Sequence, residues 1–222
     1  FSENIKIFTR VHNTQAKEKE IIDRWRKMPT PQMGRHLANQ VEPEVVDALR
    51  NAVVTAYPKI SHRYYELKRK WLGLETMQVW DRNAPLPMES DRLVTWDQAQ
   101  TIVTDAYTNF DSRMSDLIIP FFNKGWIDAG VKPGKAPGAF AHPTVTDVHP
   151  YIMLNYLGKP RDVMTLAHEL GHGVHQVLAS SQGQMLSSTP LTLAETASVF
   201  GEMLTFQQIL DNPTDTMQPK LL

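Results

Sequence analysis

Two histidines and a glutamate lie close together near residue 170, in the run His168-Glu169-Leu170-Gly171-His172. On a helix, residues four apart lie one turn above each other, so both imidazoles can face one metal ion. Glu169 lies on an adjoining face, where its carboxylate can reach a metal-bound water without binding the metal itself. The spacing therefore predicts a hydrolytic metal centre with His168 and His172 as ligands and Glu169 as general base.

A short pattern of this kind also occurs in helices that hold no metal, and paired histidines can be ordinary core residues. An open catalytic zinc site needs a third protein ligand. Glu195 can supply it from the start of the next predicted helix, after a loop short enough for an antiparallel return. Ser198 and Glu202 follow on the same helical stripe, where side chains that orient the ligand imidazoles are expected. Glu202 could instead be an ordinary solvated carboxylate.

Two further positions refine this site. Gly171 lies in the middle of its helix, where glycine costs roughly 1 kcal/mol relative to alanine; a close approach by another element would explain that cost. A third histidine six residues after His172 would be residue 178, which is Leu, so a three-histidine zinc site is absent. His175 shares the ligand face but lies far along the axis, which favours a cleft-lining or packing residue over a ligand.

The composition of the 222 residues is that of an ordinary globular protein, with 41% hydrophobic and 21% charged residues. The net charge is −1 with no long run of one sign, which argues against a nucleic-acid partner or a polybasic membrane anchor. There is no cysteine, so disulfides, thiolate metal sites and cysteine nucleophiles are excluded. The sequence has no apolar stretch long enough to span a bilayer. We expect a cytoplasmic protein, and the missing initiator Met suggests a piece of a longer polypeptide.

Most of the chain is predicted to be helical. A Thr95–Gln98 capping box opens a long helical segment that Pro120 should kink or split. Asp162 and Thr189 are the expected N-caps of the last two helices, with Pro190 at the first position of the second. The predicted helices are 16–27, 44–56, 60–72, 95–129, 162–180 and 189–210; the predicted strand is 149–157, and 80–94 (with Pro87) and 130–147 are loops.

The sequence resembles the oligoendopeptidase F branch of the thimet oligopeptidase family of zinc metallopeptidases. The resemblance is carried by TLAHELGHGVHQVL at 165–178, LAETASVFGEML at 193–204, HPYIMLNY at 149–156 and GKAPGAF at 134–140. It implies a mainly α fold, a helical zincin-type metallopeptidase core with a short β element lining a deep substrate channel. It also implies one Zn²⁺ held by His168, His172 and Glu195, with Glu169 as the catalytic base.

The resemblance also suggests an organisation for the chain. Residues 1–130 would form a helical region belonging to the upper lobe and connector, and residues 131–222 the catalytic zinc-binding region. The strand 149–156 would border the channel and pair with an extended peptide. Members of the family continue into a C-terminal helical region that contacts substrate, so we expect a fragment. Within it, His149, Tyr151 and Tyr156 are the substrate-binding and oxyanion candidates, with simple packing as their alternative.

The sequence therefore predicts a zinc-dependent endopeptidase that cleaves internal bonds of short oligopeptides, with zinc-bound water activated by Glu169. Two other interpretations stay open. One is a metallocarboxypeptidase with the same kind of helix; the other is a catalytically inactive fragment or peptide-binding module. Two imidazoles, one carboxylate and a water suit zinc among the divalent ions. The expected partners are short peptides, and the sequence does not indicate an oligomeric state.

Overall fold

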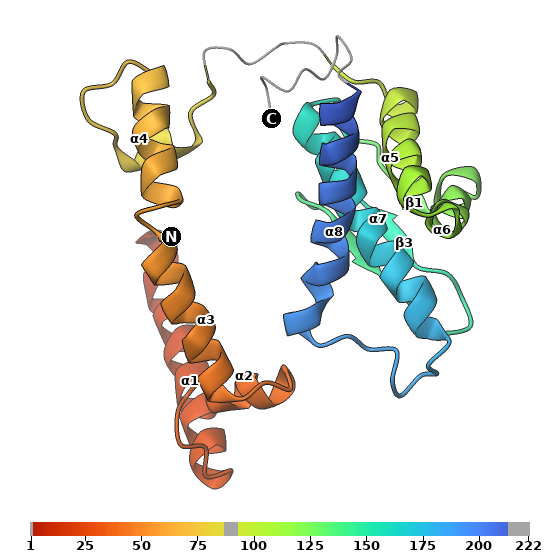
Figure 1. Ribbon diagram of the computed structural model, residues 1–222. Helices are drawn as coiled ribbons and strands as arrows, with labels where there is room; N and C mark the ends of the chain where they lie inside the picture. The colour runs from red at the N-terminus through yellow and green to blue at the C-terminus, as the bar shows by residue number, and fades with distance from the viewer. Residues whose placement is uncertain (1, 87–92, 213–222) are drawn as a thin grey trace. The chain divides into compact units, whose positions relative to one another are not determined.

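A computed structural model of the chain describes residues 2–86 and 93–212 (Figure 1). Its contacts divide the chain into two compact units, Phe1–Tyr64 and Tyr65–Leu222. This division lies well before residue 130, because the helices between residues 96 and 123 pack on the helices that carry His168 and Glu195. The catalytic role of residues 131–222 stays a prediction. Pro87 of the predicted loop lies outside the described residues.

The first unit consists of helices with little interior. A short 3-10 turn, Ser2–Asn4, leads into α1 (Ile5–Trp25), which is followed by α2 (Met33–Ala38) and α3 (Pro43–Ala56). None of the described residues in these three helices is buried. Helix α1 begins well before the predicted start at residue 16, because residues 5–15 contain no glycine or proline to interrupt it. Helix α4 (Ser61–Trp71) spans the boundary between the units.

The second unit contains a continuous hydrophobic core. After a 3-10 turn, Val79–Asn83, it is built from α5 (Trp96–Phe110), α6 (Ser112–Asn123), α7 (Pro160–Ser180), α8 (Leu191–Asp211) and a small sheet. Helices α7 and α8 pack along each other (Figure 1). The largest fully buried side chains come from these helices, from β3 and from the residue that follows β3: Tyr107, Phe121, Ile118, Ile152, Leu154, Leu166 and Leu170. The fold is thus mainly α with a minor β element, as predicted.

The sheet has three short strands, and its order corrects one expectation. Strands β1 (Ile127–Asp128), β2 (Phe140–His142) and β3 (Tyr151–Met153) are arranged β1-β3-β2. β3 pairs in parallel with β1 and antiparallel with β2. The predicted strand 149–157 is therefore shorter, and it is central. Both edges of β3 are occupied, so it cannot also pair with a peptide. β1 and β2 are the outer strands, and each has one edge that no described strand covers.

Three helix boundaries also differ from prediction. The segment 95–123 breaks at Asp111, whose carboxylate accepts a hydrogen bond from the Arg113 amide and caps α6, whereas Pro120 lies inside α6. α7 begins at Pro160, and Asp162 lies in its first turn, accepting hydrogen bonds from the backbone of Leu157 and Lys159.

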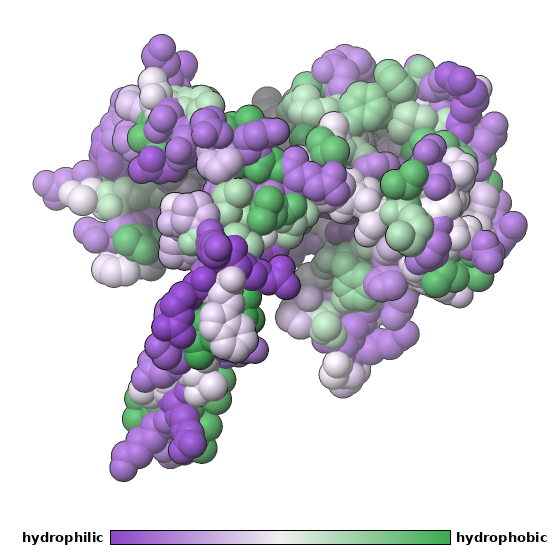
Figure 2. Space-filling view, turned by 90° about the horizontal axis from the view of Figure 1, so that it is seen from below, coloured by the Kyte–Doolittle hydropathy of each residue, from purple (hydrophilic) through white to green (hydrophobic). Residues whose placement is uncertain are grey.

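α8 begins at Leu191, with Pro190 rather than Thr189 at the N-cap position and no side-chain cap. The Thr95–Gln98 capping box is confirmed in both directions. The surface mixes polar residues with exposed apolar ones, as the face in Figure 2 shows. In the part of the chain that the structure describes, no helix has the length and apolar character needed to cross a membrane.

The close approach predicted at Gly171 is present. A Cβ added there would lie 2.4 Å from the Ala197 carbonyl oxygen and 2.8 Å from the Ser198 Cα, both on α8. Because these are backbone atoms, neither can move without shifting α8. Gly171 therefore fixes how closely α8, which carries Glu195, packs against the histidine helix.

Gly171→Ala should destabilise the second unit although alanine is the better helix former. Overpacking against a backbone typically costs about 1–3 kcal/mol, which exceeds the roughly 1 kcal/mol gained in helix propensity. Urea unfolding of the chain checks this. Gly34→Ala in α2 is the matched control, because a Cβ there meets nothing within 4 Å and should be neutral or slightly stabilising. Equal stability of Gly171→Ala and the parent would contradict the close packing of α7 and α8.

Candidate metal centre

Helices α7 and α8 bring His168, His172 and Glu195 together. One potential ligand atom from each lies within 4.8 Å of the others. The Glu195 Oε2 atom is 3.3 Å from His168 Nε2 and 3.6 Å from His172 Nε2. Four tetrahedral ligands at the usual zinc bond length of about 2.1 Å would lie about 3.4 Å apart. Two imidazoles and a carboxylate at this spacing fit a single zinc ion.

Glu202 fixes the orientation of the His168 ring. Its Oε1 atom lies 2.5 Å from His168 Nδ1, on the side of the ring away from Glu195. A carboxylate there favours the proton on Nδ1 and leaves the Nε2 lone pair available to a metal. The rings of His168 and His172 are nearly perpendicular, at 83°. Glu202 thus contacts an imidazole, as expected for a residue that orients a ligand.

Ser198 acts on a different partner from the one predicted. Its hydroxyl donates to Glu195 Oε2 at 2.7 Å, and the residue is fully buried. It therefore orients the carboxylate of Glu195 instead of an imidazole. This hydrogen bond is the main reason that the pKa of Glu195 is lowered, which keeps the carboxylate ionised.

Glu169 lies beside this cluster in a more enclosed environment. The residue is only 5% exposed, and its Oε2 atom has no hydrogen-bond partner among the described residues. Burial raises the pKa of Glu169 to about 7, and the negative charge of Glu195 adds to this effect. Burial also lowers the pKa of His172, which favours the neutral imidazole that a metal requires. A carboxylate with a pKa near neutrality is well matched to proton transfer.

The remaining predicted residues lie outside this cluster. His149 stacks on Trp126 with ring centroids 3.8 Å apart, and its Nδ1 atom is 2.9 Å from the Pro150 carbonyl oxygen. Tyr151 is half exposed and lies against His149. His175 does not belong to the three-residue ligand group.

Tyr156 contributes to the fold. Its hydroxyl donates to the Val94 carbonyl at 2.9 Å, and its ring packs edge-on against Trp96 at the start of α5. Partial burial raises the pKa of Tyr156 to about 12. These contacts agree with the packing alternative for Tyr156, and its substrate-binding role stays a prediction.

One supporting contact was missed by the sequence analysis. Tyr107 of α5 is fully buried, and its hydroxyl donates at 2.9 Å to the carbonyl of Ala167, the residue before His168. The Tyr107 hydroxyl fits against α8 because residue 201 is glycine. A Cβ at position 201 would lie 2.1 Å from the hydroxyl oxygen. Like Gly171, Gly201 is a glycine in the middle of a helix, which indicates that another element packs closely against that helix. The sequence alone does not show that the residue in contact is Tyr107.

Comparisons with known proteins show which family this chain is similar to. A model of peptidase family M3 matches residues 32–218, which include every residue of the cluster. The chain is 26% identical over 181 residues to oligopeptidase PepF of Bacillus subtilis, covering 81% of the chain and 27% of that protein. It is 29% identical over 179 residues to group B oligopeptidase PepB of Streptococcus agalactiae, covering 80% and 29%. The chain thus spans less than a third of these relatives.

Solved structures show the same fold. A protein from Bacillus anthracis described as an oligoendopeptidase F superposes with a TM-score of 0.80 at 16% identity, covering 99% of this chain and 40% of that one. PZ peptidase A superposes with a TM-score of 0.74 at 19% identity, covering 95% and 38%. The match of the family model over most of the sequence is the decisive finding: the chain belongs to peptidase family M3.

Proposed function

We propose that this chain carries the metal centre of a zinc-dependent endopeptidase that hydrolyses internal bonds of short oligopeptides. The observation that carries the proposal is the grouping of His168, His172 and Glu195 beside the buried Glu169. Membership of a peptidase family and similarity to oligopeptidases support peptides as the substrate class. A cytoplasmic location stays a prediction.

Each residue of the cluster then has a distinct task. His168, His172 and Glu195 would hold the ion, which when bound lowers the pKa of a water toward about 7 and polarises the scissile carbonyl. Glu169 accepts the proton of the attacking water and delivers it to the leaving amine. Glu202 and Ser198 keep His168 and Glu195 in the orientation that binding requires.

The peptide would lie along β2. Its outer edge is not covered by a described strand, so an extended peptide can add to the sheet there. β1 is the other outer strand, but β2 is the one that a hydrogen bond ties to the histidine helix, since Gln176 Nε2 donates to the Ala141 carbonyl at 3.1 Å. Gln176 lies one helical turn after His172, which places this edge close to the metal ligands.

Metal analysis combined with cleavage-site mapping tests the proposal. The purified chain is loaded with zinc, its metal content is measured, and an internally quenched model peptide is digested and its products identified by mass spectrometry. One zinc per chain and internal cleavage are expected. Stepwise loss of C-terminal residues would indicate a carboxypeptidase instead. Stoichiometric zinc without cleavage would contradict the enzymatic proposal for this chain and favour an inactive fragment or peptide-binding module.

The role of Glu202 gives a graded prediction. Glu202→Ala should raise the Kd for zinc by about 10–100-fold, the usual effect of losing a group that orients a ligand histidine. Glu202→Gln keeps an oxygen acceptor but loses the charge, so its Kd should lie between those of the parent and Glu202→Ala. Competition with a chromophoric chelator measures all three. Glu44→Gln, an exposed carboxylate on α3, is the control and should not change the affinity. An unchanged Kd in Glu202→Ala would contradict this role.

A further inference from the structure

The connection between β1 and β2 passes over one end of the sheet. β1 and β2 lie on opposite sides of β3, and Phe140, the first residue of β2, pairs with Met153, the last residue of β3. Residues 129–139, here called the arch, must therefore cross the C-terminal end of β3. The arch belongs to no helix or strand. Its shape has to be fixed by other hydrogen bonds.

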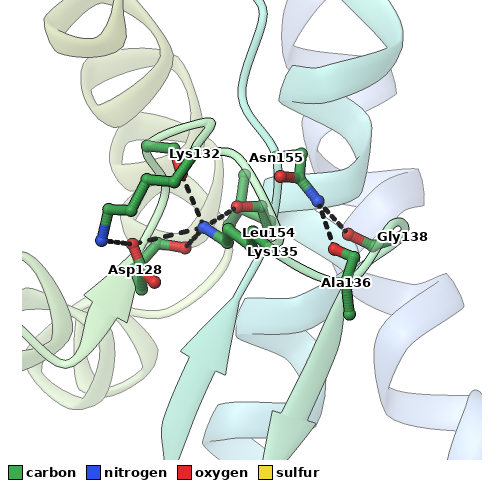
Figure 3. A network of polar contacts seen from close by, with 8 residues as sticks. Asp128, Lys132, Lys135, Ala136, Gly138, Leu154 and Asn155 are labelled. Atoms are coloured by element: carbon green, nitrogen blue, oxygen red, sulfur yellow. Dashed lines mark hydrogen bonds and ion pairs between the residues drawn. The ribbon is translucent and has the colours of Figure 1, made fainter.

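Lys135 supplies those bonds from inside the arch (Figure 3). Its Nζ donates to the carbonyls of Asp128 at 2.9 Å, Gly130 at 2.8 Å and Leu154 at 2.8 Å. A lysine ammonium has three N–H donors, so all three are used. The side chain is only 8% exposed, and the Asp128 carboxylate lies 3.2 Å from Nζ. One buried cation thus joins the end of β1, the arch and the end of β3.

Asn155 holds the second half of the arch. Its amide Nδ2 donates to the carbonyls of Ala136 at 2.9 Å and Gly138 at 3.1 Å, as Figure 3 also shows. Lys135 and Asn155 therefore connect the residues that follow β3 to the residues that precede β2.

The strand β2 depends on this arrangement for its register. It contains three residues, so its ladder with β3 is too short to define the pairing strongly. A slip of one residue would turn every side chain to the other face and would exchange which backbone groups point to the open edge. It would also displace the Ala141 carbonyl from Gln176 on the histidine helix.

We propose that Lys135 is a positioning residue for peptide binding: it fixes the register of the open β2 edge beside the metal centre. This inference rests on the proposed function, in which the peptide pairs with that edge. Lys135 does not touch the ligand cluster, so its loss should weaken peptide binding while the metal site and the chemical step stay intact.

The absence of cysteine from the chain allows a chemical test. Lys135→Cys introduces a single thiol, which is alkylated in denaturant before refolding with zinc. With 2-bromoethylamine the thiolate displaces bromide and forms a C–S bond, giving a side chain of lysine length with its ammonium. Iodoacetamide gives a neutral side chain of similar size. Lys132→Cys, treated in both ways, is the matched control, because Lys132 is exposed and also lies 3.2 Å from the Asp128 carboxylate.

Two measurements are made on each protein. Amide hydrogen exchange of residues 136–142, read by mass spectrometry, should be about tenfold faster or more in the neutral Lys135→Cys protein. Its KM for the model peptide should rise by about tenfold, with kcat within about threefold of the parent, which is the signature of lost uniform binding. Zinc content should not change. Aminoethylation should restore both exchange and KM, and none of the Lys132→Cys proteins should differ from the parent.

The outcomes separate this inference from the proposed function. Unchanged exchange and KM in the neutral Lys135→Cys protein would overturn the inference and leave the peptidase proposal in place. A fall in kcat without a rise in KM, or equal behaviour of the charged and neutral adducts, would also overturn it. If the parent binds zinc but cleaves no peptide, the proposed function is contradicted. The role of Lys135 in positioning a peptide is then contradicted as well. This holds even if hydrogen exchange shows that Lys135 orders the arch.

Discussion

Glu169→Gln should keep zinc and lose nearly all turnover. The substitution preserves shape but removes the ability to accept a proton, and a positioned general base is typically worth about 10²–10⁴ in rate. Glu169 is suited to that task because it is enclosed and its Oε2 atom is not engaged by another described group. The measurements are kcat for the model peptide and zinc content of the same sample. Retention of more than about a tenth of the parent turnover would contradict the role.

Stability provides the control for this variant. Folding raises the pKa of Glu169 from 4.5 to about 7, so between these pH values the folded chain holds more protons than the unfolded chain. The stability of the metal-free parent should therefore fall as the pH rises through this window, by up to about 3 kcal/mol. Gln does not titrate, so metal-free Glu169→Gln should be the more stable protein above pH 7 and nearly equal to the parent below pH 4.5. If Glu169→Gln loses turnover while its free energy of unfolding rises, the loss of activity cannot be explained by unfolding.

The parts of the site that sequence predicted well are those that depend on helix geometry. His168, Glu169 and His172 share one helix, and the 3.6-residue period alone determines which faces they occupy. Glu195 is on another helix, but the short loop and the mid-helix Gly171 together required α8 to return close to α7. Glu202 then followed from its place on the same stripe as Glu195.

The parts that could not be predicted depend on pairing between distant segments. The run 149–157 is rich in strand formers, but its sequence does not say whether a strand is central or at an edge; that depends on β1 and β2, which lie at other positions in the chain. Tyr107 and Ala167 are 60 residues apart, and Lys135 and Leu154 are 19 apart. Neither contact has a local signature. The helix break at Asp111 is marked in the sequence by a carboxylate of an N-capping type, but the prediction considered only Pro120 as the break.

Removing a metal ligand should abolish stoichiometric zinc binding. His168→Ala and Glu195→Ala each leave two protein ligands, and Glu195→Ala also removes the only ligand that α8 contributes to the group. Zinc at about 100 times its Kd should stabilise the parent by about 3 kcal/mol, because the ion binds the folded state and joins α7 to α8. Both variants should lose most of that stabilisation. Metal analysis after dialysis and thermal unfolding with and without zinc measure the two effects.

His175→Ala is the control that makes this result specific. His175 lies on α7 near His172, but it is not in the ligand group, so this variant should retain zinc and its stabilisation. The opposite pattern, with zinc kept by Glu195→Ala and lost by His175→Ala, would replace the two-histidine, one-glutamate site by a site formed by α7 alone. In that case Gly171 and Ser198 would have no part in metal binding, since both act through the approach of α8 and the orientation of Glu195. The pair of variants therefore tests whether the metal site needs both helices.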